Sequence, residues 1–193
     1  MNKMNMTKER VELLRGELFH MILFSMAWVL IGEYLLHFSD YAIGAAITLV
    51  VVVMLAFYSI KLYDLEDTFE KEDGIVKEMR TDRLYALILI FEGIAVLVTW
   101  VILLNRGYDR WVIAAFAAIA GLHFFPLARV IRLRSYYVLG TWICIVAAVG
   151  YWLMNNGAVK EELASTIIAY ACAAGALIDG LMIMTRSRSR LMK

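Results

Sequence analysis

Three ionisable side chains, Glu92, His123 and Asp179, stand inside long apolar stretches of this sequence. A charge in apolar surroundings is costly unless it is paired or neutralised. Two carboxylates in a dry site raise each other's proton affinity, whereas a nearby imidazole favours their ionised forms. Such a group can exchange a proton near neutral pH. The three residue types therefore predict a site that relays protons or cations.

Hydroxyl side chains follow the same polar faces. Tyr85, Glu92 and Thr99 are seven residues apart, which places them almost in line along one side of a helix. Thr141 belongs to a similar polar stripe on a later segment. We expect these hydroxyl groups to face the interior and to assist a relay.

The chain's single proline, Pro126, lies three residues after His123 in the stretch GLHFFPLAR. Proline has no backbone N–H, so the carbonyl of Leu122 loses its usual helical donor beside the histidine. A kink with a spare acceptor suits a gate or a proton site. It equally suits a tolerated bend near a helix end, and both interpretations stay open here.

These residues belong to a chain of 193 residues that is 62% hydrophobic, with a mean hydropathy of +0.70. A soluble domain of this size cannot bury so much apolar surface, whereas a membrane-crossing helix needs about 20 mostly apolar residues. The runs are continuous rather than alternating, which excludes a membrane β-barrel. We predict one all-α transmembrane domain over residues 1–193, a six-helix bundle of three hairpins with spans at about 18–36, 41–62, 84–104, 111–128, 136–154 and 163–185.

The basic residues fall mostly on one side of these spans. Sixteen of the nineteen Lys and Arg residues flank one set of ends, and the remaining three are Arg106, Arg110 and Lys160. Short loops rich in Lys and Arg stay in the cytoplasm. We therefore expect a multi-pass protein of the plasma membrane with both termini in the cytoplasm.

The three deep ionisable residues are expected at a common depth. Glu92, His123 and Asp179 are nine, six and seven residues from the nearest cytoplasmic arginine of their own segments. At 1.5 Å per residue this corresponds to depths of about 9 to 14 Å. One hypothesis is that they border a single polar cavity in the cytoplasmic half of the bundle. The alternative is that each bonds separately to a neighbouring helix.

Residues 63–83 form the one sizeable hydrophilic segment between spans, with eight acidic and four basic residues. Helical spacing continues past both adjoining apolar runs, and an Asp-Gly pair ending at Gly74 is a turn signal. We expect a short cytoplasmic helical hairpin. Its acidic residues Glu66, Asp67 and Glu70 are candidates for contact with a protein partner or an ion, and the alternative is a solvated charged face.

The segment around His123 has two different faces. Ala114, Ala117, Ala118 and Gly121 form a seam of small residues that lets a neighbouring backbone approach, and His123 lies on roughly the opposite side. Either this helix has two buried faces, or His123 faces a second copy of the chain in a homo-oligomer.

Several classes of function lack their motifs. The sequence has no HExxH, GxSxG or P-loop pattern, and its two cysteines lie inside apolar runs without metal-ligand spacing. Neither end resembles a nucleic-acid-binding module. We predict no catalytic residues, no metal site, no cofactor and no nucleic-acid partner, with the lipid bilayer as the main surrounding.

Three hypotheses of function remain, the first favoured: a transporter or channel for a proton, cation or small solute. The second is a non-catalytic membrane sensor, accessory or immunity-type protein that acts through the acidic hairpin. The third is an intramembrane enzyme, which is disfavoured because one deep histidine and two deep acids barely supply a catalytic metal site. The stretch GLHFFPLAR within this six-span plan resembles small membrane proteins of Bacillus-type bacteria, a resemblance that implies no activity.

Overall fold

The chain folds into a bundle of long helices. The computed structural model describes residues 8–36, 42–66 and 75–191. These ranges contain no β-strand, so the predicted all-α class is confirmed. In chain order the helices are α1 (Lys8–Leu35), α2 (Ala42–Glu66), α3 (Ile75–Asn105), the short 3₁₀ helix η1 (Asp109–Trp111), α4 (Val112–Ile131), α5 (Ser135–Asn155) and α6 (Glu161–Leu191).

Five of the helices contain apolar segments long enough to cross a membrane. The described part of α2 adds a shorter apolar segment, Thr48–Leu62. Each predicted span lies within one α-helix to within a residue, because a continuous apolar run in this composition specifies a helix whatever it packs against. The five long segments are Val11–Leu35, Arg83–Asn105, Asp109–Ile131, Ser135–Asn155 and Glu161–Thr185.

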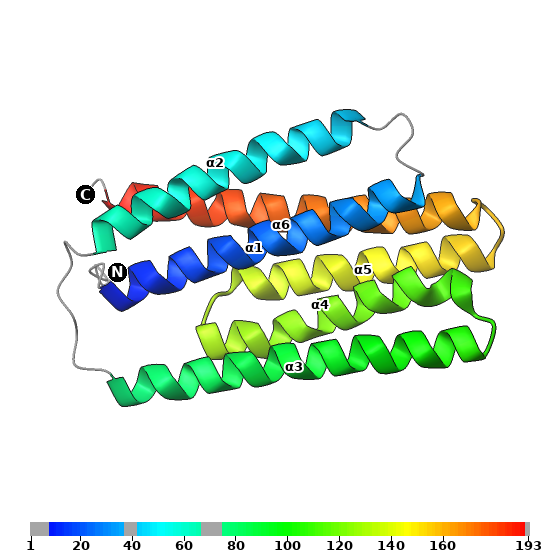
Figure 1. Cartoon of the computed structure of the whole chain (residues 1–193), viewed down its shortest axis with the longest axis horizontal. Coiled ribbons are helices and arrows are strands. Elements are labelled where there is room, and N and C mark those ends of the chain that lie inside the picture. Colours follow the sequence, from blue (N-terminus) through cyan, green and yellow to red (C-terminus); the bar gives the residue numbers. More distant parts are fainter. Residues whose placement is uncertain (1–7, 37–41, 67–74, 192–193) are drawn as a thin grey trace.

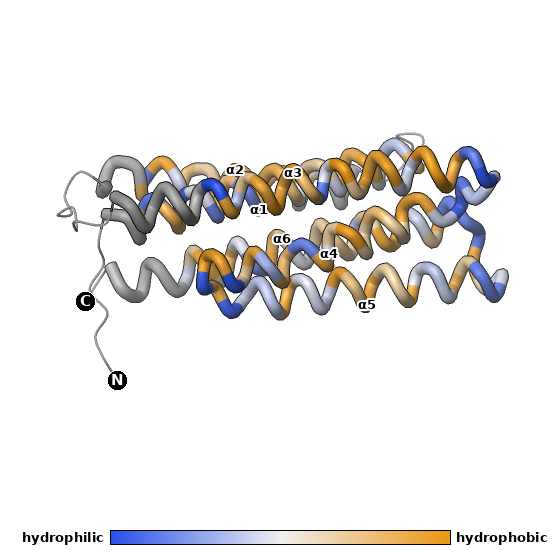
Figure 2. The backbone as a smooth tube through the Cα atoms, turned by 90° about the horizontal axis from the view of Figure 1, so that it is seen from below, coloured by the Kyte–Doolittle hydropathy of each residue, from blue (hydrophilic) through white to orange (hydrophobic). Residues whose placement is uncertain are grey.

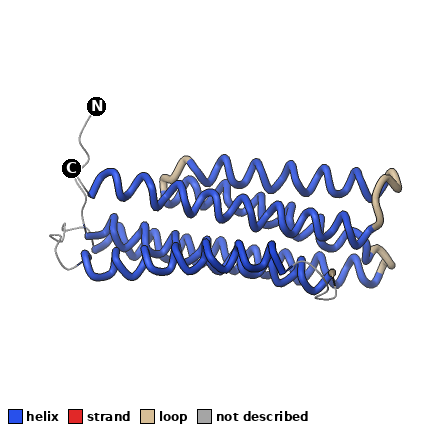
Figure 3. Tube along the Cα trace, turned by 90° about the horizontal axis from the view of Figure 1, so that it is seen from above, coloured by secondary structure: helices blue, strands red, loops and turns tan. Residues whose placement is uncertain are grey.

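The helices form two layers along one long axis. Figure 2 shows α1, α2 and α3 on one side and α4, α5 and α6 on the other, and Figure 3 shows the two layers of helices from the opposite direction. In Figure 1, α1 begins, α2 ends and α3 begins at the end of the bundle where the described chain approaches both termini, which we call the terminal end. The α3–α4 and α5–α6 connections lie at the opposite end, which we call the loop end.

The main hydrophobic core lies between α1, α4, α5 and α6. Its largest fully buried side chains include Phe124 of α4, Tyr136 of α5 and Ile168 of α6. A second cluster joins α1, α2 and α6, where Leu18 of α1 and Leu55 of α2 have no exposed surface. By contrast, α3 contributes only partly buried side chains to the core and is packed mainly on α4.

Helices α4 and α5 touch through their backbones at two glycines. A Cβ atom on Gly121 would lie 2.9 Å from the backbone N of Cys144 and 3.1 Å from the carbonyl O of Gly140. Ala114 and Ala117 of the predicted small-residue seam are buried, as is His123 on the other side of α4. This helix therefore has two buried faces within one chain, the first of the two arrangements expected for it.

The helices beside the acidic segment extend beyond the apolar runs, as the spacing predicts. α2 continues four residues past Leu62 to Glu66, and α3 begins at Ile75, nine residues before Leu84. Residues 67–74, which include Asp67, Glu70 and the expected turn at Gly74, lie outside the described residues. The proposed contacts of the acidic hairpin therefore stay a prediction.

The close α4–α5 approach generates a test of packing. Gly121→Ala is expected to destabilise the protein by about 1–3 kcal/mol, since the new methyl group overlaps the α5 backbone. Gly93→Ala on α3 is the matched control: its Cβ meets nothing within 4 Å, and alanine favours a helix over glycine by about 1 kcal/mol. Thermal unfolding in detergent should show a lower Tm for the first variant and an equal or higher Tm for the second. Equal Tm values for Gly121→Ala and the wild type would contradict the tight crossing.

Candidate functional site

A cluster of ionisable side chains connects the two layers of the bundle. It begins on α3, where Tyr85 and Glu92 are two helical turns apart and so project from one side of the helix. Both are partly buried, whereas large apolar residues on the other sides of α3, such as Phe91 and Val98, are exposed. The polar side of α3 therefore faces inward toward α4 and α1.

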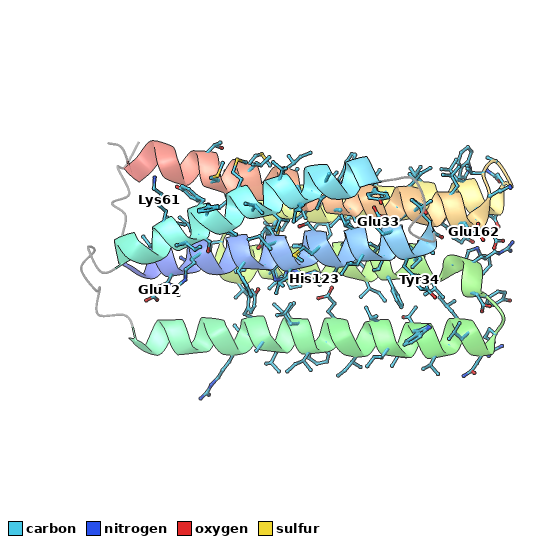
Figure 4. All side chains as sticks on the ribbon, turned by 45° about the horizontal axis from the view of Figure 1, so that its top comes forward. Glu12, Glu33, Tyr34, Lys61, His123 and Glu162 are labelled. Atoms are coloured by element: carbon cyan, nitrogen blue, oxygen red, sulfur yellow. The ribbon has the colours of Figure 1, made fainter. Side chains whose placement is uncertain are left out.

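Glu92 meets His123 of α4. Its Oε1 atom lies 3.0 Å from the Nδ1 atom of His123, and the two side chains are 20% and 5% exposed. The distance is that of an ion pair when the imidazole is protonated, but the orientation of Nδ1 is not that of a hydrogen bond. Figure 4 labels His123 near the middle of the long axis of the bundle. The contact thus joins an acid and an imidazole deep between two helices.

A second histidine, His20 of α1, continues the cluster. Its Nδ1 atom is 2.9 Å from the Tyr85 hydroxyl, and its ring centroid is 6.1 Å from that of His123. The rings of Phe24 and Phe124 contact both imidazoles and enclose them. In each imidazole the Nε2 atom is buried, and no described residue hydrogen-bonds to it. Each of the two enclosed imidazoles thus has a buried Nε2 atom with no hydrogen-bond partner among the described residues.

Two buried carboxylates extend the cluster to α6. Glu17 of α1 is 2% exposed and Asp179 of α6 is 1% exposed, and the two interact electrostatically. Glu17 also interacts with Tyr85. The series therefore runs from Glu92 through the two histidines and Tyr85 to Glu17 and Asp179, across four helices.

The residues named from the sequence divide into two groups. Tyr85, Glu92 and His123 belong to one contact cluster, and Asp179 interacts electrostatically with Glu17, which in turn interacts with Tyr85. The single cavity expected for Glu92, His123 and Asp179 stays a prediction.

The other named residues lie apart from this series. Thr141 is exposed on α5 and donates its hydroxyl hydrogen to the carbonyl of Tyr137 at 2.8 Å. Thr99 is half-buried, two turns beyond Glu92 on α3. Pro126 is exposed, and α4 continues through it as an α-helix to Ile131. Glu66 ends α2.

Glu17 and His20 were missed by sequence reasoning. The first span is predicted from Leu18, where the apolar run begins, so Glu17 falls outside it, and His20 lies among apolar residues at its edge. The spacing does contain a signal for Glu17. It lies three residues after Leu14 and four before Met21, so all three side chains are on one face of the helix, and that face is buried.

The described residues contain no group of three or more His, Cys, Asp or Glu side chains arranged to hold a metal ion. Comparison of the chain with protein-family models, curated proteins and solved structures finds no match. The site combines carboxyl groups, two imidazoles and a phenol, with the aromatic rings of Phe24 and Phe124 around the imidazoles.

The Tyr85–His20 hydrogen bond is open to direct test. Tyr85→Phe removes the hydroxyl group and is expected to cost about 1 kcal/mol of stability, and to shift the Nδ1 resonance of His20 in spectra of ¹⁵N-histidine-labelled protein. Tyr34→Phe is the matched control, because Tyr34 is 72% exposed. An unchanged histidine spectrum in Tyr85→Phe would show that the two side chains do not interact.

Proposed function

We propose that this chain is a multi-pass protein of the bacterial plasma membrane that moves protons, or a cation coupled to protons, through the buried series of ionisable side chains. The first support is the apolar surface. Large hydrophobic residues such as Leu30, Phe57 and Phe91 are more than half exposed on α1, α2 and α3. A bilayer removes the cost of such exposure, whereas water does not.

The orientation of the bundle follows from its charged ends. The exposed Arg83 lies in the part of α3 toward the terminal end, and the exposed Arg132 and Arg134 lie at the α4–α5 turn, on the same side of the bundle (Figure 1). Arg106, Arg110 and Lys160 lie in or beside the connections at the loop end. By the positive-inside rule the terminal end faces the cytoplasm. The stacked Tyr108 and Trp111 rings at the loop end suit the opposite membrane interface, where aromatic side chains gather.

The contact between Glu92 and His123 is the observation that carries the proposal. A charged residue near the middle of a membrane helix costs about 2.5–3.5 kcal/mol on insertion scales, and this bundle buries several such groups in one series. A fold that needed only packing would place apolar residues there, since well-packed apolar replacements of buried ion pairs are often neutral or stabilising. The retained groups are those that can accept and release protons.

The order of the groups suggests a route. In the proposed route Glu92 and His123, 3.0 Å apart, exchange a proton when the imidazole turns its Nδ1 atom into line with the carboxylate, and an imidazole accepts a proton at one nitrogen while it releases another from the second. The ring centroids of His123 and His20 are 6.1 Å apart, so the two imidazoles are neighbours along this route. From His20 the Tyr85 hydroxyl leads toward Glu17 and Asp179.

Proton flux is the direct test. In liposomes that enclose a pH-sensitive dye, wild-type protein is expected to dissipate an imposed pH gradient, and Glu92→Gln or His123→Ala to slow this at least tenfold. Glu33→Gln is the matched control. Glu33 accepts a hydrogen bond of 2.6 Å from the Tyr170 hydroxyl, and it lies outside the series, nearer the loop end in Figure 4.

Two outcomes would overturn the relay. One is wild-type flux equal to that of protein-free liposomes, across gradients of protons, sodium and potassium. The other is a flux in Glu92→Gln as fast as in the wild type, which would show that the route does not use this residue. Only the first result, no flux above background, would leave the non-catalytic accessory role as the better hypothesis.

The orientation has its own test. In a background in which Cys144 and Cys172 are replaced by alanine, Asn156→Cys should react with a membrane-impermeant maleimide added to intact cells. Gly74→Cys should react only after permeabilisation. The reverse pattern would invert the predicted orientation, and labelling of both sites from outside would contradict the odd number of crossings, three, predicted between them.

A further inference from the structure

Helix α3 is the least enclosed long helix of the bundle. None of the residues 83–105 that form its apolar segment is buried, whereas each of the other four long apolar segments contains buried residues. Figure 1 shows α3 at one edge of the bundle, where it packs mainly on α4. An outward movement of α3 therefore costs less packing than a movement of α1, α4, α5 or α6.

The tight glycine contacts of the bundle join the other helices. Gly150 of α5 lies against Ile168 of α6, and Gly180 of α6 lies against Leu55 of α2. The one glycine of α3 is Gly93, and a Cβ atom there would meet nothing within 4 Å. Lipid chains surround apolar side chains as well as protein does, so helices in a membrane associate through close packing and polar contacts. Close packing of the glycine kind contributes little to the attachment of α3.

Two polar contacts attach α3 to its neighbours. The Oε1 atom of Glu92 lies 3.0 Å from Nδ1 of His123 on α4, and the Tyr85 hydroxyl lies 2.9 Å from Nδ1 of His20 on α1. The second contact can persist in either charge state of the imidazole, because a phenol oxygen both donates and accepts hydrogen bonds. The attraction in the first contact requires a charge on Glu92. The protonation of Glu92 therefore controls how firmly α3 is held.

The other titratable groups near this contact do not replace the charge of Glu92. The groups around Glu92 and Tyr85 are His123 on α4, and His20 and Glu17 on α1. Acid neutralises Glu92 and charges the two imidazoles, which then repel each other. In acid Glu17 is neutral as well, so no carboxylate remains to attract the imidazoles. Low pH is thus the condition that loosens α3.

Gly107 lies where α3 joins the next helix. Its backbone φ is 70°, in the left-handed region, which glycine adopts without the steric cost that other residues meet. α3 ends at Asn105 and η1 begins at Asp109, so residues 106–108 alone make this connection, at the loop end of the bundle. Hinges are a few loop or terminal residues that absorb a change in φ and ψ. Gly107 meets this description.

We propose that α3 is a gate on the cytoplasmic side of the series. It lies against α4 and α1 while Glu92 is ionised, and it tilts outward about Gly107 when Glu92 takes up a proton. Since the pivot is at the loop end, the terminal half of α3 moves furthest, and water from the cytoplasm reaches Tyr85 and His20. The movement itself stands on the contacts of α3, and its role as a gate rests on the proposed function.

The distance between two spin labels measures this tilt in the full-length protein in nanodiscs. With Cys144 and Cys172 replaced by alanine, labels are attached at Leu87→Cys on α3 and Val138→Cys on α5, both exposed positions. Leu87 is about 30 Å from Gly107 along the helix axis, so a tilt of about 15° moves its label by about 8 Å. Double electron–electron resonance resolves a change of this size.

The α3–α5 pair should show one short distance at about pH 7.5, and acid at about pH 4 should raise the population of a longer distance at least tenfold. Glu92→Gln should populate the longer distance already at pH 7.5, because glutamine has the shape of the acid without its charge. Glu33→Gln is the matched control: Glu33 joins α1 to α6 through Tyr170, so the short distance should remain. A second pair of labels, at Phe19→Cys on α1 and Val138→Cys on α5, should keep its distance at both pH values.

Four results would overturn the gate. One is an α3–α5 distance that does not change with pH, and another is a short distance in Glu92→Gln at neutral pH. The third is a long distance in Glu33→Gln at neutral pH, which would deny Glu92 a specific role. The fourth is an equal change in the α1–α5 pair, since acid would then rearrange the whole bundle. If Glu92→Gln does not fold, the acid response of the α3–α5 pair against that of the α1–α5 pair still decides.

The gate and the relay fail separately. An acid-induced tilt without proton flux would overturn the relay and leave a pH-dependent movement of α3. Proton flux without a tilt would overturn the gate and leave the relay.

Discussion

Polar groups held in apolar surroundings must find partners inside the protein, and this constraint organises the helices around the cluster. α3 is the clearest case. Most of its side chains are exposed, and its polar side meets α4 through Glu92 and His123 and α1 through Tyr85 and His20. Between helices in lipid, where apolar association supplies little drive, such polar contacts and close packing are what hold neighbours together.

Close packing supplies the second half of the arrangement. The glycines Gly121 and Gly140 bring α4 and α5 into backbone contact, which leaves the opposite side of α4 for the bulky side chain of His123. Helix α6 has a similar arrangement. Gly180 lies against Leu55 of α2, and Asp179, the residue before Gly180, interacts with Glu17 of α1. Small residues on one side of a helix thus make room for ionisable residues on another.

The sequence by itself determined where the helices form and which ionisable residues are energetically costly to place inside them. Continuous apolar runs specify helices regardless of their neighbours, and Glu92, His123 and Asp179 stand out because charge in such runs is expensive. Only the tertiary structure decided the pairings. Glu92 meets His123, and Glu17 and His20 join the cluster, because partners across helices depend on how each helix is rotated about its axis and where it crosses the next. Those rotations follow from contacts such as Gly121 against Gly140. The small-residue seam that contains Gly121 is a periodic signal within its own helix, but it does not indicate which helix the seam meets or where the two cross.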